Sequence, residues 1–436
     1  MKYNTIIIGG GTAGLFFSAI TPTNKKTLLI DHNTKLGVKL LMSGNGQCNI
    51  THSGSIKDFI NKYGNNGKYI RKILYKHSNI NLVNYIKSLG IPLSTKENGK
   101  VFPASMDSRQ IVNSLIAHAK SNGVDFQLGR KVISITNINN QQQDLQINTK
   151  HINQYEKINN TNLSTENTNY EIKLNNGDTY LCENLVIACG GLSYPKTGSD
   201  GSIVEVLNQN FTLKWKKQTP ALCPVFVDNY NFSDLSGISI NNVILSIKKK
   251  NNDKITYLSK EDSLLFTHKN LSGPLILNSS RHIDAGDTIL INFLPSINRE
   301  NFTSKIKLSI QKEKISLSSY LSRNYKLPKR FIVSLLKEIS LENAKLPEIN
   351  SKQLKTLIEK LFSWSFTCTS KAGFNQAMVT AGGLDISQIN LSTMESNSYK
   401  NLFFIGEILD IDGDTGGYNI QFAYSSAMAS IDKIYS

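Results

Sequence analysis

A glycine run near the N-terminus has the residue types and the spacing of a dinucleotide-binding turn. Gly9, Gly11 and Gly14 form a Gly-x-Gly-x-x-Gly pattern, and Asp31 follows Gly9 by twenty-two residues. In such sites the glycines allow a tight turn, a close approach to pyrophosphate and close helix packing, while an acid about twenty residues on binds a ribose hydroxyl. The run therefore predicts an FAD or NAD site with an unphosphorylated ribose.

A second cluster lies close to the C-terminus. The apolar residues 403–405 run into Gly406 and Glu407, and residues 414–419 (Asp-Thr-Gly-Gly-Tyr-Asn) precede a final helical pattern. Flavin sites use a late acid for the ribityl hydroxyls and a helix N-terminus for the edge of the ring that becomes negative on reduction. We therefore expect the two ends of the chain to enclose one FAD.

Two further loops carry candidate chemistry. Residues 43–51 are small and polar, so their backbone can approach a flat ring, and they include Cys48. A reachable Cys48 thiol of suitable pKa could protonate a substrate carbon; a packed structural cysteine is the alternative. Residues 190–198 follow a buried strand, where ligands gather in α/β sheets, and they offer Tyr194 and Lys196 as substrate contacts or as ordinary loop residues.

The elements that must position these residues follow from hydrophobic patterning. Residues 3–8 and 27–30 read as strands around a helix at 15–20, which is a βαβ unit, and residues 185–189 and 402–405 read as buried strands. A closing helix is predicted at about 418–434. There is no second Gly-x-Gly-x-x-Gly run, so NAD(P)H is expected to dock only transiently.

The sequence predicts a discontinuous domain. Residues 1–200 are the first part of a Rossmann-like α/β domain, and residues 366–436 hold the return of the β-rich domain and the second part of the α/β domain. Residues 201–300 are β-rich, with strands near 225–227, 238–247 and 288–294, and residues 301–365 are helical. Residues 137–170 hold ten Asn and five Gln among 34 positions, and we interpret them as a flexible expansion of a hairpin.

Composition narrows the class of protein. The 436 residues are 39% hydrophobic, and no apolar run approaches the ~20 residues that cross a membrane, so a soluble chain with no membrane partner is expected. The five cysteines are spread out, which argues against a disulfide framework or a metal site and favours the cytoplasm.

The charge is positive and uneven. Lys and Arg number 49 against 33 Asp and Glu, a net of +16, of which residues 303–371 carry +9 and residues 211–371 carry +12. Around Tyr325, the cations Arg323, Lys326, Lys329 and Arg330 have the composition of a phosphate-binding and base-stacking surface, although a solvated helix face is the alternative.

Taken together, these segments resemble the BaiN/RdsA-like (YhiN-type) family of bacterial NAD(P)/FAD-dependent oxidoreductases. The resemblance rests on residues 9–14, 37–49, 101–103, 190–198, 266–268, 272–274, 380–383, 393–396 and 406–419. One departure is Gln47, where the family usually has Arg before the cysteine. The resemblance implies an FAD domain interrupted by a β-barrel-like domain and a small helical domain.

The resemblance also implies reduction of a carbon–carbon double bond with electrons from NAD(P)H. The favoured substrate is uridine in large-subunit (23S) rRNA, giving dihydrouridine; the alternatives are a small-molecule ene-reductase and a non-catalytic, FAD-bound RNA-binding factor. The predicted cofactor-binding residues are Gly9, Gly11, Thr12, Ala13, Gly14, Asp31, His32, Lys39, Ser43, Gly44, Gly46, Asn49, Val132, Gly190, Gly191, Gly406, Glu407, Asp414, Gly417, Tyr418, Asn419 and Ile420.

Overall fold

The computed structural model describes residues 1–138, 169–250, 254–259 and 261–436. The chain forms two compact units: unit 1 is Met1–Thr219 with Val379–Ser436, and unit 2 is Pro220–Met378. The Asn/Gln-rich prediction falls mostly on residues 139–168, which lie outside the described residues.

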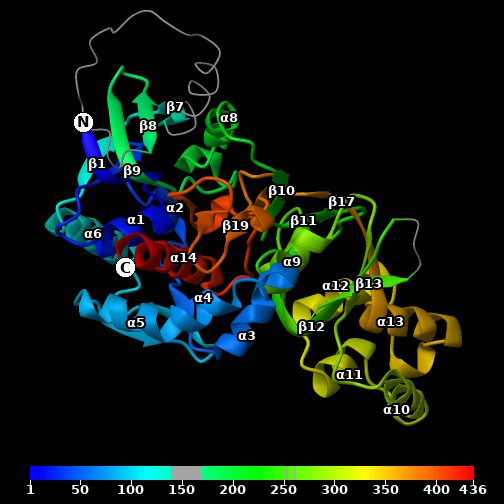
Figure 1. The fold of residues 1–436 in the computed structure, drawn as a ribbon. Helices are drawn as coiled ribbons and strands as arrows, with labels where there is room; N and C mark the ends of the chain where they lie inside the picture. Colours follow the sequence, from blue (N-terminus) through cyan, green and yellow to red (C-terminus); the bar gives the residue numbers. More distant parts are fainter. Residues whose placement is uncertain (139–168, 251–253, 260) are drawn as a thin grey trace, which may run out of the picture. The chain divides into compact units, whose positions relative to one another are not determined.

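Unit 1 is built on a nine-stranded sheet with the order β19-β20-β21-β9-β1-β2-β6 (Figure 1). Off this path, β8 pairs antiparallel with β9, and β7 pairs antiparallel with β8. The strands are β1 (Lys2–Ile8), β2 (Thr27–Asp31), β6 (Asp125–Leu128), β7 (Val132–Asn137), β8 (Tyr170–Leu174), β9 (Thr179–Ile187), β19 (Ile389–Asn390), β20 (Glu395–Ser396) and β21 (Leu402–Phe404). The predicted strands at 3–8, 27–30 and 402–405 are confirmed within two residues, whereas the strand predicted at 185–189 begins six residues earlier, at Thr179, and ends at Ile187.

The parallel register brings four chain-distant segments to one edge. Strands β6, β2, β1, β9 and β21 run parallel, with Ile8 opposite both Ile30 and Ile187, and Phe404 also opposite Ile187. Because parallel strands end at the same edge, the residues that follow β1, β2, β9 and β21 come together. The predicted glycine turn, Asp31 and the loops after 189 and 405 therefore meet there.

Helices cover this sheet and complete unit 1. They are α1 (Thr12–Ile20), α2 (Val38–Met42), α3 (Ile56–Ile60), α4 (Arg71–Lys76), α5 (Asn79–Ser88), α6 (Ser108–Ser121), α8 (Ser202–Asn208) and α14 (Tyr418–Tyr435), with the 3₁₀ turns η1 (Asn61–Asn66), η2 (Pro195–Thr197), η6 (Ile386–Gln388) and η7 (Gly406–Ile408). Helix α1 packs between α14 and α6, and its Leu15, Phe16 and Phe17 are fully buried. Burial of side chains of this size stabilises by about 1.5–3 kcal/mol each, which fixes the start of α1 at the sheet edge.

Two small sheets complete the strands of unit 1. Strands β3 (Thr51–His52), β5 (Lys100–Pro103) and β4 (Leu93–Thr95) pair antiparallel in that order. Strand β10 (Trp215–Ala221) pairs with β18 (Val379–Leu384), so the chain passes to unit 2 and returns through neighbouring strands.

Unit 2 contains a closed antiparallel barrel, as the resemblance implied. Strands β12 (Ser239–Lys248), β14 (Asp262–Phe266), β15 (Leu271–Ser272), β11 (Val225–Val227), β17 (Trp364–Lys371) and β16 (Thr288–Asn292) pair in that order, and β16 pairs back onto β12. Strand β13 (Ile255–Leu258) pairs antiparallel with β12 and is not part of the closed ring.

Helical segments share the core of the barrel. They are α9 (Gly273–Ser279), α10 (Arg299–Lys312), α11 (Leu317–Asn324), α12 (Lys329–Glu338) and α13 (Ser351–Ser363), with η3 (Ser233–Leu235), η4 (Ser280–His282) and η5 (Leu346–Glu348). One hydrophobic cluster includes Phe266 of the barrel and Phe331 of α12. The predicted helical segment and most of the predicted β-rich segment therefore lie in one compact unit, Pro220–Met378.

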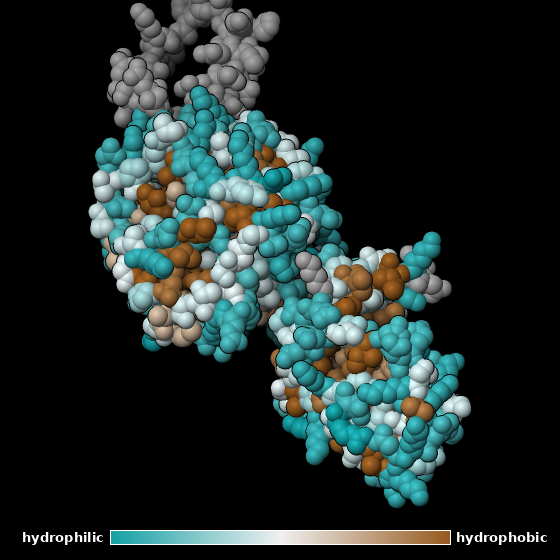
Figure 2. All heavy atoms as spheres, turned by 90° about the horizontal axis from the view of Figure 1, so that it is seen from below, coloured by the Kyte–Doolittle hydropathy of each residue, from teal (hydrophilic) through white to brown (hydrophobic). Residues whose placement is uncertain are grey.

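The surface of each unit is mostly hydrophilic, with apolar side chains scattered over it (Figure 2). Exposed apolar residues in unit 2 include Leu258, Leu308 and Val333. No described helix combines the length and the hydropathy needed to span a bilayer.

Candidate functional site: a dinucleotide-binding edge in unit 1

In the glycine turn, the packing of the protein requires glycine at two positions and leaves free space at a third. A Cβ on Gly9 would lie 2.5 Å from the carbonyl oxygen of Ala188, and one on Gly14 would lie 1.9 Å from that of Gly9. A Cβ on Gly11 would meet nothing within 4 Å. Packing therefore explains Gly9 and Gly14, whereas the free space at Gly11 fits the close approach of a ligand.

Asp31 holds this turn in place. Its Oδ2 accepts a hydrogen bond from the Gly10 amide at 2.6 Å, and its Oδ1 accepts one from the Asn33 amide at 2.7 Å. Each carboxylate oxygen has a second lone pair, so both can still accept from a ribose hydroxyl. Asp31 thus fits its predicted role and also orders the loop.

The two ends of the chain meet at Gly406. Its φ is +72°, which favours glycine, and a Cβ there would lie 2.9 Å from the Cβ of Ala13. Its amide donates to the Ser426 hydroxyl of α14 at 3.0 Å. The first and last helices of unit 1 therefore flank the same edge of the sheet.

Four side chains form a partly buried polar group, the Lys39 network (Lys39, Ser193, Thr380 and Glu407). The Lys39 ammonium donates to Glu407 Oε2 at 2.6 Å and to Ser193 Oγ at 2.5 Å. Glu407 Oε1 accepts from Ser193 Oγ at 2.6 Å and from the Thr380 amide at 2.8 Å. Ser193 and Thr380 are fully buried, whereas the side chains of Lys39 and Glu407 are 24% and 20% exposed.

The loop at 43–49 is a compact turn. The amides of Gly46 and Cys48 donate to the Ser43 carbonyl at 3.1 and 2.9 Å, and Gly44 and Gly46 have φ of +57° and +82°. Gly46 accepts from the Ser108 amide of α6 at 2.8 Å, and a Cβ on Gly46 would meet nothing within 4 Å. Gly46 thus offers the second open glycine of the site.

Cys48 lies in the hydrophobic core of unit 1 and has no exposed surface. Burial raises the pKa of its thiol to about 11, with a hydrogen bond from Ser43 acting in the opposite direction. A thiol that is buried and stays protonated at neutral pH is a weak acid with no path to a substrate. The proton-donor role of Cys48 stays a prediction, and this geometry favours the packing alternative.

The loop that leads into α14 is fixed from the other side by η1. The Tyr63 hydroxyl donates to the Tyr418 carbonyl at 2.8 Å, the Asp414 amide donates to the Lys62 carbonyl at 2.8 Å, and the Lys62 ammonium lies 3.7 Å from Asp414 Oδ2. The Asn419 carboxamide closes the loop through two bonds with Gly413, at 2.7 and 2.8 Å.

Helix α14 begins without a side-chain cap, after Gly417 at φ +92°. The Asn49 carboxamide, oriented to satisfy its hydrogen bonds, accepts from the Gly417 amide at 3.2 Å. The next amides of the helix have no intrahelical acceptor and carry its positive dipole end. The Tyr418 ring packs on Phe59 and the Asn419 carboxamide binds Gly413, so backbone groups are what these two residues offer to a ligand.

The other predicted cofactor residues differ in what they expose. Gly190 has φ +73°, and a Cβ on Gly191 would lie 2.4 Å from Thr380 Oγ1, so the structure requires glycine at both. His32 is exposed, and Thr12 and Ile420 are half-buried. The Val132 side chain is buried between β7 and its neighbours, which leaves only its backbone for a cofactor.

Of the two predicted substrate contacts in unit 1, Tyr194 is half-buried with φ +52° and Lys196 is exposed. Sequence reasoning did not single out Ser193, Thr380 or Tyr63 as site residues. Thr380 stands in a Thr-Ala-Gly-Gly run that carried the resemblance, which was the available signal. Ser193 and Tyr63 are identified only by their hydrogen bonds to distant segments.

These residues fit an FAD. Open space at Gly11 and Gly46, uncapped helix N-termini at α1 and α14, and acids at 31 and 407 are the features that a pyrophosphate, a flavin ring and two polyol groups require. The described residues hold no group of three or more His, Cys, Asp or Glu side chains arranged to bind a metal ion.

The predicted basic surface of unit 2 is only partly available. Tyr325 is buried, with its ring centroid 5.1 Å from that of Phe302, so the expectation that it stacks on a base is wrong. Arg323 pairs with Glu313, and Arg330 donates to the Asp234 carbonyl. Lys326 and Lys329 are exposed, and within the described chain neither has a carboxylate within 4 Å; we call them the 326/329 pair.

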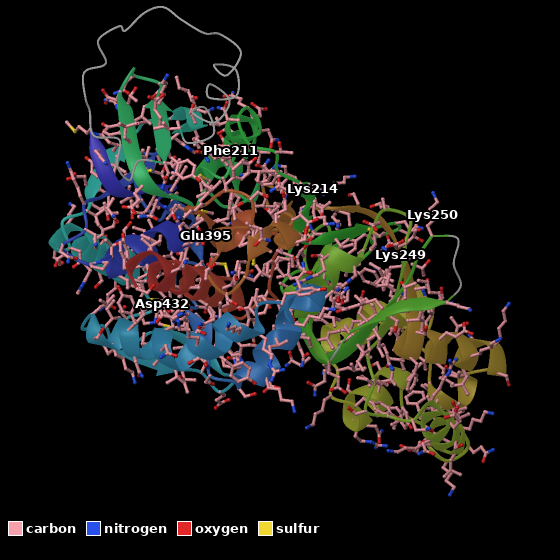
Figure 3. The ribbon with its side chains drawn as sticks, in the orientation of Figure 1. Phe211, Lys214, Lys249, Lys250, Glu395 and Asp432 are labelled. Carbon is pink, nitrogen blue, oxygen red and sulfur yellow. The ribbon has the colours of Figure 1, made fainter. Side chains whose placement is uncertain are left out.

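Other basic residues of unit 2 are also held internally. The Lys249 ammonium, labelled in Figure 3 at the end of β12, lies 2.8 Å from both Asp284 Oδ2 and Asp287 Oδ2. With the observed limits, unit 2 carries 22 Lys and Arg against 13 Asp and Glu, a net of +9, and unit 1 carries +7. The net charge of unit 2 is smaller than the +12 of residues 211–371 because Lys214, Lys216 and Lys217 belong to unit 1.

The chain is similar to known proteins over almost its whole length. Two curated ribosomal RNA dihydrouridine synthases are 30% identical: one from Escherichia coli (strain K12) over 98% of this chain and 97% of its own, and one from Haemophilus influenzae over 97% and 96%. A 3-dehydro-bile acid delta(4,6)-reductase from Clostridium scindens is 23% identical over 96% of each chain.

The model of the HI0933-like protein Rossmann domain matches residues 3–161 and 147–432. These matches extend over almost the whole chain, including both halves of the sheet edge described above. The chain therefore belongs to the HI0933-like family of FAD-dependent oxidoreductases.

Proposed function

We propose that this protein reduces a carbon–carbon double bond with electrons from NAD(P)H, and that its substrate is uridine in 23S rRNA, giving dihydrouridine. The observation that carries the proposal is the 30% identity to two ribosomal RNA dihydrouridine synthases, in each case over 96% or more of both chains. Such a substrate places the protein in the cytoplasm.

Different residues of the chain bind different parts of the cofactor. The α1 amides beside Gly11 bind the pyrophosphate, Asp31 accepts from the adenosine ribose, and Glu407 accepts from the ribityl chain. The first amides of α14, held by Tyr63 and Asn49, donate to the edge of the ring that gains negative charge.

When bound, FAD supplies a ring that takes a hydride from a nicotinamide and gives one to an activated double bond. The protein's task is to hold the uridine C5=C6 bond against this ring and to supply the one proton that accompanies the hydride. The chain has no second dinucleotide fingerprint, so NAD(P)H and substrate use the site in turn.

The 326/329 pair supports an RNA substrate, because exposed lysines without acidic partners bind phosphates and release counterions. Arg323 and Arg330 keep the Lys-rich segment in place through Glu313 and Asp234, and their remaining N–H groups can donate to phosphate. Tyr194 and Lys196 are proposed as contacts to the reacting nucleotide.

A small-molecule ene-reductase is the second candidate, because the bile acid reductase also aligns over 96% of the chain. Its lower identity, 23%, favours RNA, and the positive charge of unit 2 suits a polyanion such as RNA better than an uncharged small molecule.

The test is mass spectrometry of rRNA nucleosides from a strain that lacks the gene. We expect dihydrouridine to disappear from 23S rRNA and to return with the wild-type gene. Unchanged dihydrouridine would refute the rRNA assignment; NAD(P)H oxidation by the purified FAD-loaded protein with conjugated enones would then identify the second candidate. Retained binding to rRNA without either activity would identify a non-catalytic factor.

A further inference from the structure

A second basic surface lies in unit 1, on helix α4 and the residues just before it. Residues 55–89 carry seven Lys and Arg against one Asp, a net of +6, although the whole of unit 1 carries only +7. Four of these cations fall within the nine residues 68–76, which contain no acid. Most of the net charge of unit 1 therefore belongs to one short segment.

Two tyrosines stand among these cations. Tyr69 and Tyr75 are 53% and 52% exposed, and of the Phe, Tyr and Trp residues that the structure describes only these two are more than half exposed. The Lys68 ammonium lies 4.9 Å from the Tyr69 ring centroid, and the Arg71 guanidinium lies 5.5 Å from that of Tyr75. We call Lys68, Tyr69, Arg71, Lys72 and Tyr75 the α4 surface.

Charge pairing separates the α4 surface from the cation that follows it. Lys76 lies 2.6 Å from Asp432, so its charge is compensated within unit 1. Lys68, Arg71 and Lys72 are exposed, and no carboxylate of the described residues lies within 4 Å of them. Three cations without an acidic partner, beside two open rings, are therefore available to a ligand.

The α4 surface is fixed against the helix that begins at the candidate site. Just before it, the Asn66 carboxamide donates to the Asp410 carbonyl at 2.7 Å. Just after it, the His77 carbonyl accepts from Gln421 and Ser425 of α14 at 3.0 and 2.7 Å. A ligand on the α4 surface therefore lies beside α14, whose first amides belong to the candidate cofactor site.

Unpaired RNA has the chemistry that this surface recognises. Each nucleotide of a single strand offers a phosphate to a cation and a flat base to an aromatic ring, and such stacking tolerates any base. A duplex keeps its bases stacked on one another, so they cannot reach the rings. An anionic membrane would need apolar side chains to insert, whereas those of α4, Ile73 and Leu74, are buried.

We propose that the α4 surface binds a single-stranded segment of the RNA substrate. Tyr69 and Tyr75 stack on bases, and Lys68, Arg71 and Lys72 contact phosphates. The inference rests on the proposed rRNA substrate and adds a binding surface in the same unit as the cofactor site, whereas the 326/329 pair belongs to unit 2.

The test measures binding of a fluorescent oligouridine to the FAD-loaded protein by anisotropy, over a range of salt concentrations. Tyr69→Ser with Tyr75→Ser should weaken binding about ten- to a hundredfold and leave the salt dependence unchanged, because stacking on a tyrosine neutralises no phosphate. Tyr69→Phe with Tyr75→Phe keeps both rings and should bind like wild type.

The cations should give a different signature. Lys68→Gln with Lys72→Gln should make the slope of log binding constant against log salt concentration shallower by about 0.7 per lysine, the value for single strands. FAD binding should be unchanged in all these variants.

Two controls change exposed residues of unit 1 outside the α4 surface. Ile133→Ser removes another exposed apolar side chain, and Lys120→Gln with Lys400→Gln removes two exposed cations; neither should change oligouridine binding.

Three results would count against the proposal. Wild-type affinity in the double serine variant, or an equal loss in the controls, would overturn the α4 surface alone. Binding of phosphatidylserine vesicles through these residues, with oligouridine binding independent of them, would overturn it in favour of a membrane surface. A wild-type protein that binds no RNA would overturn the proposed rRNA substrate as well.

Discussion

Substitution of two glycines in the same turn separates folding from cofactor binding. Gly11 is the N-cap of α1 with φ −76°, so alanine is sterically allowed there, and its Cβ meets no protein atom within 4 Å. Gly14 lies one turn later, and its Cβ would be 1.9 Å from the Gly9 carbonyl oxygen, where ordinary contact begins near 3.4 Å.

The magnitudes follow from this geometry. Gly11→Ala should cost the apo-protein about 1 kcal/mol at most, the size of an N-cap change, or about 2 °C in Tm. A methyl group in the path of the pyrophosphate should cost about 1–3 kcal/mol of binding, which is a five- to 150-fold loss of FAD affinity. Gly14→Ala must move α1 by about 1.5 Å and should destabilise the fold by about 3 kcal/mol or more.

Thermal unfolding of the apo-proteins, together with fluorescence titration of FAD, measures both effects. Gly11→Ala should retain its Tm and lose the cofactor, whereas Gly14→Ala should lower Tm by roughly 6 °C or fail to accumulate. A Gly11→Ala protein that binds FAD as tightly as wild type would refute the assignment of the open space to the pyrophosphate.

Three other outcomes are expected. Glutamine at both positions of the 326/329 pair should make the slope of log binding constant against log salt concentration for rRNA shallower by about one unit per lysine, with FAD binding unchanged. The control is Lys352→Gln with Lys355→Gln on α13; the same result there would show a diffuse charge effect instead. FAD-loaded Cys48→Ala should lose about 1–2 kcal/mol of stability yet restore dihydrouridine in the deletion strain. A loss of activity with FAD still bound would support the thiol as the proton donor. Tyr63→Phe should destabilise unit 1 by about 1 kcal/mol and weaken FAD severalfold, because the bond to the Tyr418 carbonyl is buried; unchanged FAD affinity would separate η1 from the cofactor site.

The pattern of apolar residues and glycines predicted the elements that position the site, because each such pattern depends only on residues close together in the sequence. The alternation of apolar strand, glycine turn and helix is set by residues a few positions apart, and β1, α1, β2 and α14 appear within two or three residues of their predicted limits. The basic stretch shows the limit of such reasoning. Tyr325 and its neighbouring cations are adjacent in sequence, yet the ring is buried against Phe302 and two of the four cations have partners ten and 96 residues away.

By itself, the sequence predicted a dinucleotide site and the glycines and acids expected to form it, because turn chemistry and the acid's spacing are properties of short segments. Only the tertiary structure decided what each residue does there. The parallel register brings four chain-distant loops to one edge, where Lys39, Ser193, Thr380 and Glu407 complete a network that no local pattern encodes. For Cys48, the sequence left a reactive and a structural role open, and burial in the core of unit 1 favours the structural one.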